Sequence, residues 1–214
     1  VLMPGYNYDL ARAGKGPARE WAFFPSYNSE EANSLLEVNA SQQDKDYIAA
    51  VHWTVAEQCV KDGKAKQMPA RYAHNVMDPK SHVATSTMET STTFLDAKEC
   101  PGVVYYLPTP KSPHGVDVDP SCELITAGGK LASLIPVFSY TKMVKAIEDK
   151  AFDGEASGVP ILKYDAVIAG EVKEPGLGPL HTEFDGQGNA YTSMFLSSEI
   201  VKWRVKDCAV LDRI

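Results

Sequence analysis

Two stretches of the chain share one layout, and each places a histidine shortly after a proline. They are residues 112–120, which contain His114, and residues 178–186, which contain His181. A polar turn and a strand-like run follow each histidine, and the two copies repeat at an interval of about seventy residues. We therefore expect two equivalent structural units that present their imidazoles at equivalent turns. Neutral imidazole is a good ligand for soft-to-borderline metals, so such a pair predicts part of a metal site.

The rest of the pattern is that of many short strands with few helices. Residues 54–63 have helical periodicity, with Thr54 expected to cap the helix and Gly63 to end it. Residues 141–152 predict a second short amphipathic helix. The polar stretch 64–91 has weak periodicity and indicates an extended connection. The expected strands lie near residues 21–24, 47–53, 103–107, 124–127, 134–138, 159–168, 190–195 and 200–203. This pattern predicts an all-β fold with short helical insertions, typical of propeller blades.

Composition excludes several classes of protein. The chain has 28 acidic and 21 basic residues, for a formal charge of −7, which argues against a nucleic-acid partner and favours a cationic protein partner. A hydrophobic content of 44% is enough for a core, and the sequence has neither a signal peptide nor a membrane span. Its four cysteines show no C-x-x-C spacing, so we expect buried thiols without a metal or redox role.

At four motifs the sequence resembles the nitrous-oxide reductase family. They are residues 27–30, 107–115, 127–131 and 176–193, within a similarity that extends over residues 26–204. The resemblance implies part of the family's seven-bladed β-propeller, with residues 1–25 as a loop-rich lead-in and residues 26–214 as blades. The family's C-terminal cupredoxin domain, which carries a binuclear copper centre called CuA, is absent from these residues. Because the chain starts at Val1 and stops within an expected strand, we interpret it as a fragment.

The resemblance also assigns roles to the two histidines. His114 and His181 match two of the seven histidines that ligate the family's tetranuclear copper-sulfide cluster, where nitrous oxide is reduced to N2 and water with two electrons and two protons. We therefore expect both residues to be catalytic copper ligands. Two ligands cannot close the cluster, so the fragment alone is expected to be inactive. The alternative is a metal-free propeller that serves as a binding or scaffold module. A metal-storage or electron-carrier protein would need Met and Cys clusters, which the sequence lacks.

A calcium site is a second implication of the resemblance. Tyr27 and Glu30 match positions that bind a structural calcium ion in the family, and Asp46 supplies a further carboxylate. Asp44 is an alternative to Asp46, because the intervening loop differs in length, and Ser112 matches another position that offers an oxygen. An ordinary acidic surface loop remains the competing interpretation.

Other candidates receive less support from their surroundings. Three further histidines, His52, His74 and His82, lack the repeated motif and are left out of the site. Residues 128–130 lack the spacing of a phosphate-binding loop. Asp185 is explained by a turn, and Glu183 is a possible outer partner of His181.

The family's biology completes the expectations. The resemblance implies a periplasmic location, a homodimer in the full-length protein, and a small electron donor such as a cytochrome c or a cupredoxin.

Overall fold

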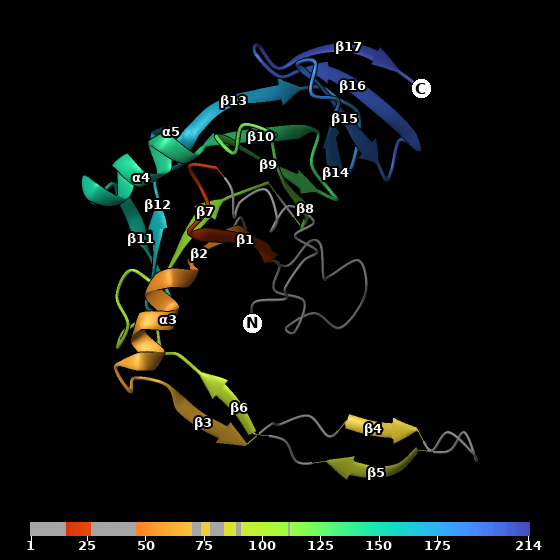
Figure 1. The fold of residues 1–214 in the computed structure, drawn as a ribbon. Coiled ribbons are helices and arrows are strands. Elements are labelled where there is room, and N and C mark those ends of the chain that lie inside the picture. Colours follow the sequence, from red (N-terminus) through yellow and green to blue (C-terminus); the bar gives the residue numbers. More distant parts are fainter. Residues whose placement is uncertain (1–15, 27–45, 70–73, 78–83, 89–90, 111) are drawn as a thin grey trace.

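The fold is known from a computed structural model, which describes residues 16–26, 46–69, 74–77, 84–88, 91–110 and 112–214. These residues are mostly β, as the alternating pattern predicts, with short helices between strands. Three larger sheets follow one another along an arc (Figure 1). Within the described residues, no helix has the length and apolar character needed to span a membrane.

The first sheet combines strands that are far apart in the sequence. Its strand order is β1-β2-β7-β12-β11, and only the β7–β12 pair in it is parallel. The strand bounds are β1 Trp21–Ser26, β2 Tyr47–His52, β7 Val104–Pro108, β11 Phe152–Ala156 and β12 Val159–Leu162. In the sequence, β11 and β12 lie between the third and fourth strands of the central sheet, yet they pair with the first sheet and extend it.

The other two larger sheets share one design. The central sheet has the order β8-β9-β10-β13 and the C-terminal sheet has the order β14-β15-β16-β17, both antiparallel. Their strands are β8 Pro113–Val118, β9 Leu124–Gly129, β10 Leu134–Ser139, β13 Ile168–Lys173, β14 Pro179–Phe184, β15 Asn189–Met194, β16 Glu199–Arg204 and β17 Ala209–Arg213. The first strands β8 and β14 lie against each other, as do the last strands β13 and β17 (Figure 1). The repeat in the sequence therefore corresponds to two adjacent four-stranded units.

Two hydrophobic clusters hold the three sheets together. The larger one lies between the first sheet, the central sheet and the helix α4 (Tyr140–Glu148), and includes Phe23, Leu107 and Phe138. A second cluster joins the central and C-terminal sheets through Ile135, Val137, Val172, Ala190 and Trp203. Trp203 is fully buried, and its indole N–H donates to the Thr192 hydroxyl at 2.9 Å. The C-terminal sheet is therefore packed onto its neighbour and is not an independent unit.

The two predicted helices are confirmed, but one of their caps is not. Helix α3 covers Trp53–Lys61, and its N-cap position is His52, which makes no side-chain capping bond. The predicted cap at Thr54 is therefore wrong, because β2 passes directly into the helix. Helix α4 covers Tyr140–Glu148 and is capped by Ser139, whose hydroxyl accepts from the Lys142 amide at 3.1 Å.

Two segments that were predicted to be extended need correction. The stretch 64–91 contains strands β3 Lys66–Pro69, β4 His74–Met77, β5 Ala84–Met88 and the start of β6 Ser91–Phe94. They form the antiparallel pairs β3–β6 and β4–β5, which lie away from the larger sheets (Figure 1). Their sequences therefore need not alternate between apolar residues facing a core and polar residues facing solvent. The run 159–168 is interrupted by the single-turn helix α5, Tyr164–Val167, which lets β12 and β13 join different sheets.

A disulfide links Cys59 of α3 to Cys100, just before β7, with their Cα atoms 6.2 Å apart. The expectation of buried thiols is wrong for this pair. The two cysteines are separated by 41 positions, so no local spacing motif announces the bond. The disulfide packs with Val103 in a small apolar cluster of its own and closes the base of the β3–β6 excursion.

Candidate metal centre

His114 and His181 meet at the contact between the central and C-terminal sheets. Their ring centroids are 5.1 Å apart, and the rings lie edge to face at 82°. His114 belongs to β8 and His181 to β14, the first strands of the two equivalent sheets, and both side chains are half-buried. The two histidines do come from equivalent units, but they lie within strands and not at the turns predicted from the sequence.

Each histidine lies where the pairing of its strand is irregular. The β8–β9 register shifts between Pro113 and Gly115, with His114 as the additional residue. The β14–β15 register shifts between Pro179 and Thr182, a span that contains His181. A bulge bends the strand locally and redirects a side chain that regular alternation would place elsewhere. The shared irregularity therefore explains how both imidazoles reach the same space.

Two glycines allow the two sheets to approach closely at this point. A Cβ atom at Gly115 or at Gly128 would overlap the backbone carbonyl of Leu180, the residue before His181. Glycine has no side chain, so it permits backbone-to-backbone contact that any other residue would block. The His181 segment is thus seated directly on the β8–β9 hairpin.

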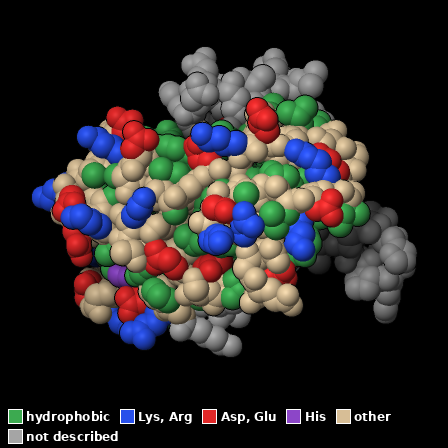
Figure 2. Space-filling view, turned by 90° about the horizontal axis from the view of Figure 1, so that it is seen from above, with side chains coloured by type: hydrophobic (Ala, Val, Ile, Leu, Met, Phe, Trp, Pro, Cys, Tyr) green, Lys and Arg blue, Asp and Glu red, His purple; other side chains and the backbone are tan. Residues whose placement is uncertain are grey.

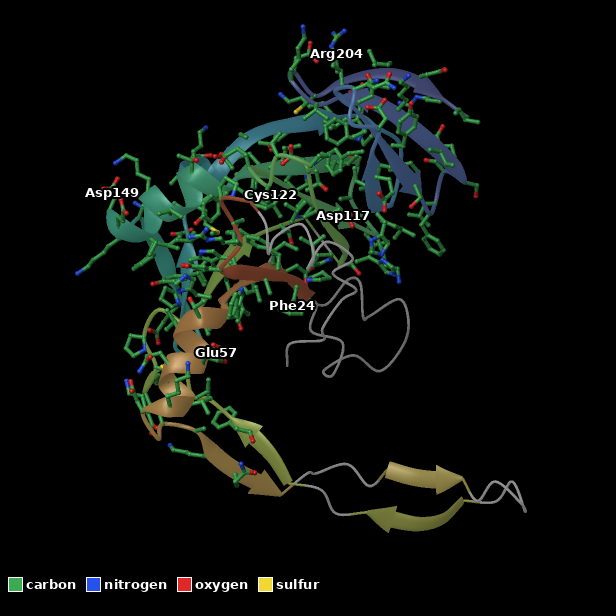
Figure 3. The ribbon with its side chains drawn as sticks, in the orientation of Figure 1. Phe24, Glu57, Asp117, Cys122, Asp149 and Arg204 are labelled. Carbon is green, nitrogen blue, oxygen red and sulfur yellow. A yellow bond between two sulfur atoms is a disulfide. The ribbon has the colours of Figure 1, made fainter. Side chains whose placement is uncertain are left out.

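Asp117 connects the two strands and was not identified from the sequence. One of its carboxylate oxygens, Oδ1, lies 3.3 Å from Nδ1 of His181. The other, Oδ2, accepts from the backbone N–H of Thr182 at 2.6 Å. The Asp117 side chain is only 4% exposed, and Figure 3 shows it at the boundary between the central and C-terminal sheets. The only signal in the sequence is an acidic residue between two valines, Val116 and Val118, of β8.

The two imidazoles have different surroundings. Within the part of the chain that the structure describes, the buried Nδ1 of His114 has no hydrogen-bond partner. Burial lowers the pKa of His114, and the nearby positive charges of His181 and Lys130 lower it further. The hydrogen bond that the His181 ring donates to the Asp117 carboxylate raises the pKa of His181, in spite of the partial burial of the ring. His114 therefore favours the neutral form that binds metals, while His181 is held by a carboxylate.

The predicted calcium residues are only partly visible. Asp46 is fully buried at the start of β2, and its Oδ2 accepts from the backbone N–H of Ser112 at 2.6 Å. The structure thus brings together two of the residues that were expected to offer oxygens. Tyr27, Glu30 and Asp44 lie outside the described residues. Asp46 also ties the first sheet to the segment that leads into His114.

The remaining candidates lie apart from the histidine pair or play other roles. His52 faces Glu20 at 3.4 Å and packs on Trp21 with ring centroids 4.4 Å apart. His74 lies in β4, and His82 lies outside the described residues. The turn assigned to Asp185 is confirmed, since its Oδ1 accepts from the Gln187 and Asn189 amides. Asp117, not Glu183, contacts the His181 ring.

The described residues alone do not enclose a metal ion. Among them, no group of three or more His, Cys, Asp or Glu side chains is arranged to hold one. A metal ion bound by His114 and His181 would therefore need further ligands. Elsewhere, on the face shown in Figure 2, acidic and basic side chains are interspersed among hydrophobic ones.

Comparison with known proteins gives consistent relatives. The nitrous-oxide reductase of Ralstonia nicotianae is 34% identical over 210 residues, which cover 98% of this chain and 27% of that protein. The enzyme of Stutzerimonas stutzeri is 35% identical over 185 residues, covering 85% of this chain and 24% of that protein. The enzyme of Cupriavidus necator is 33% identical over 186 residues, which cover 86% of this chain and 24% of that protein. The chain therefore spans about a quarter of the length of these curated relatives.

Other comparisons add little. No family model matches the chain. Among solved structures, the hydrazine synthase of Kuenenia stuttgartiensis superimposes with a TM-score of 0.39 at 12% identity, covering 88% of this chain and 56% of that one, which is too low to support an argument. The curated relatives all carry the same name and align over nearly the whole of this sequence. The chain thus belongs, as a segment of about a quarter of the full length, to the nitrous-oxide reductase family.

Proposed function

We propose that this chain forms part of the catalytic domain of a nitrous-oxide reductase, in which His114 and His181 bind copper. The observation that carries this proposal is the meeting of two imidazoles, 5.1 Å apart, from equivalent irregular positions of two equivalent strands. In the proposed enzyme these residues are two of the seven histidine ligands of a tetranuclear copper-sulfide cluster.

The residues present fit such a group. Imidazole nitrogen is a good copper ligand, and a buried nitrogen without a hydrogen-bond partner among the described residues, as on His114, is costly unless something binds there. Because two imidazoles cannot complete a cluster, the remaining ligands are assigned to other parts of the longer protein.

We propose further that the sheets are blades of a seven-bladed propeller. The identical strand order of the central and C-terminal sheets, and the contact between their first strands, are the arrangement expected of successive blades. In this proposal residues 1–25 are a lead-in whose last part, β1, joins the first sheet, residues 26–214 are blades, and a separate cupredoxin domain carries CuA. First strands that line a common axis would direct their histidines toward it.

The proposed reaction is the reduction of N2O to N2 and water, with two electrons and two protons. The copper cluster, when bound, would supply the electrons and polarise the inert substrate. The chain's own part is to hold two imidazoles in fixed positions at the boundary of two rigid sheets. We assign electron delivery to CuA and, beyond it, to a small donor such as a cytochrome c or a cupredoxin. The acidic net charge of −7 favours a basic donor.

Two further features of the family are kept as proposals. A periplasmic location is supported by the Cys59–Cys100 disulfide, because such bonds persist in oxidising compartments. A homodimer of the full-length protein follows from the family alone.

Calcium binding at Asp46, with Tyr27 and Glu30, is also a proposal. Its support is the buried Asp46 carboxylate beside Ser112, at the approach to His114. Titration of the chain with CaCl2, followed by thermal unfolding, should raise the melting temperature more than MgCl2 does. The Asp46→Asn variant should lose the difference. An equal response to both ions would argue for an ordinary acidic loop.

The copper site is tested on the full-length protein, produced with copper and its assembly factors. His114→Ala and His181→Ala should each lose cluster absorbance, bound copper and N2O consumption. His52→Ala is the matched control, since His52 contacts Glu20 and Trp21 instead, and it should retain all three. Circular dichroism verifies that the variants fold. A colourless wild-type protein would favour the metal-free scaffold. Variants that keep a full copper complement would show that His114 and His181 are not copper ligands.

A further inference from the structure

We infer that Asp117 is a positioning residue that fixes the ring of His181 with its Nδ1 protonated, which leaves Nε2 as the nitrogen available to a metal. This inference rests on the proposed copper site for the identity of the metal, but its structural part concerns only the residues of this chain. Asp117 lies on β8 and His181 on β14, so the contact joins the two strands that carry the imidazoles.

Both oxygens of the carboxylate are engaged with the β14 segment. The Thr182 amide donates to Oδ2 at 2.6 Å, which fixes the position of the carboxylate against the backbone of the residue after His181. Oδ1 then faces the His181 Nδ1 at 3.3 Å. An ionised carboxylate can only accept hydrogen bonds, so the ring nitrogen that faces it must carry the proton. In the neutral ring, the lone pair is then on Nε2.

The carboxylate suits this place better than a neutral amide would. Its two neighbours, the Thr182 N–H and the His181 Nδ1–H, are both donors. Asparagine has one acceptor oxygen, and its NH2 group would face one of these donors. Metal-bound histidines commonly donate their second nitrogen to a carboxylate, which fixes the tautomer and the orientation of the ring.

The surroundings of Asp117 are rigid enough for such a role. The Thr182 hydroxyl is 2.8 Å from the Thr192 hydroxyl, which accepts from the Trp203 indole at 2.9 Å. All three side chains are buried, so the strand that carries His181 is tied both to Asp117 and to its own sheet. His114 has no corresponding carboxylate among the described residues, and its Nδ1 is unpartnered there. The two rings are therefore controlled differently.

A purely structural Asp117 would tie the two sheets together without determining the tautomer. The test therefore reads the tautomer directly, in the metal-free chain labelled with 15N-histidine. Long-range 1H–15N spectra, recorded well above the usual imidazole pKa, distinguish protonated from unprotonated ring nitrogens. The His181 signals are assigned by their loss in His181→Asn.

We expect a protonated Nδ1 for His181 in the wild type and a shift of the proton toward Nε2 in Asp117→Ala. The variant Asp117→Asn, which keeps the size of the side chain, should shift the equilibrium between the two His181 tautomers partway. It provides a second test in case the alanine variant does not fold. Glu183→Gln is the matched control, because it removes a nearby negative charge without touching the ring, and it should leave the tautomer unchanged.

A second measurement connects the tautomer to the metal. In the full-length protein, Asp117→Ala should lower copper affinity about 10–100-fold, the usual effect of losing such a partner, while Glu183→Gln retains it. The inference would be overturned if Nδ1 of His181 were unprotonated in the wild type, or if Asp117→Ala left the His181 tautomer unchanged. If the tautomer depends on Asp117 but the full-length wild type binds no copper, the copper site fails while the control of the ring by Asp117 is supported.

Discussion

At the scale of single residues, the contact between the two histidine strands depends on the absence of two side chains. Gly115 and Gly128 lie against the carbonyl of Leu180, and neither has a positive φ that would by itself require glycine. Their role is therefore steric, because they leave room for the Leu180 carbonyl. A side chain at either position must push β14 away, and His181 is the next residue after the one displaced.

We predict that Gly128→Ala destabilises the chain by about 1–3 kcal/mol, the usual cost of overpacking, because the obstructing group is backbone that cannot rotate away. Chemical denaturation measures this loss. Gly170→Ala is the matched control, since a Cβ there would meet only the Cys208 sulfur, at 2.8 Å, and that side chain can move. Equal losses in the two variants would refute the steric explanation.

The residues of the site were predictable to different degrees. His114 and His181 could be found because each carries a repeated local motif, and a repeat implies equivalent positions in space. Asp117 could not, because its role depends on which strand lies beside β8, and that neighbour begins sixty or so residues later in the chain, across one whole unit of the repeat. The close approach at Gly128 was missed for the same reason.

At the scale of elements, the disulfide joins the two ends of the segment that runs from α3 to β7. Cys59 lies on α3 and Cys100 precedes β7, so the bond closes the segment that contains the strand pairs β3–β6 and β4–β5. A covalent link across such a long loop restricts the unfolded chain more than the folded one. The small apolar cluster around the bond packs the same two elements against each other.

We predict that replacing both cysteines, in Cys59→Ser with Cys100→Ser, lowers the free energy of unfolding by about 2–4 kcal/mol. Denaturation of the oxidised wild type and of the variant gives the difference. Adding reductant to the wild type should reproduce most of it. Cys208→Ser, at a half-buried cysteine outside the disulfide, should have little effect. A wild type insensitive to reductant would show that the bond is dispensable.

Element positions followed from the sequence where a local pattern determines them. The apolar spacing of α4 is local, and the helix overlaps the predicted range 141–152, although it begins one residue earlier and ends at Glu148. The start of α3 was missed because β2 continues into the helix without a capping side chain, so Thr54 has no capping role. The irregularities at His114 and His181 depend on the register of the partner strands β9 and β15, which a single strand's sequence does not reveal.

At the scale of the whole molecule, the pair of His114 and His181 lies at a boundary between two sheets, so its geometry depends on how rigidly those sheets are joined. The boundary is held at the inner strands by Gly115, Gly128 and Asp117. Farther out it is held by the apolar cluster around Trp203. Trp203 also donates to Thr192, whose hydroxyl contacts Thr182 beside His181. Packing and the site are thus coupled through one buried side chain.

We predict that Trp203→Ala costs about 3–5 kcal/mol, because a large, fully buried ring is lost from the cluster between two sheets. Hydrogen exchange should show the loss first in β14–β17, whose attachment depends on this cluster, while β1 and β2 keep their protection within the other core. Trp203→Phe removes the donor to Thr192 and one part of the ring system but keeps an aromatic ring in the cluster, so it should cost clearly less than Trp203→Ala. If protection in β1 and β2 fell together with that in β14–β17, the described residues would unfold as one cooperative unit. The Trp203 cluster would then not determine the stability of the C-terminal sheet separately.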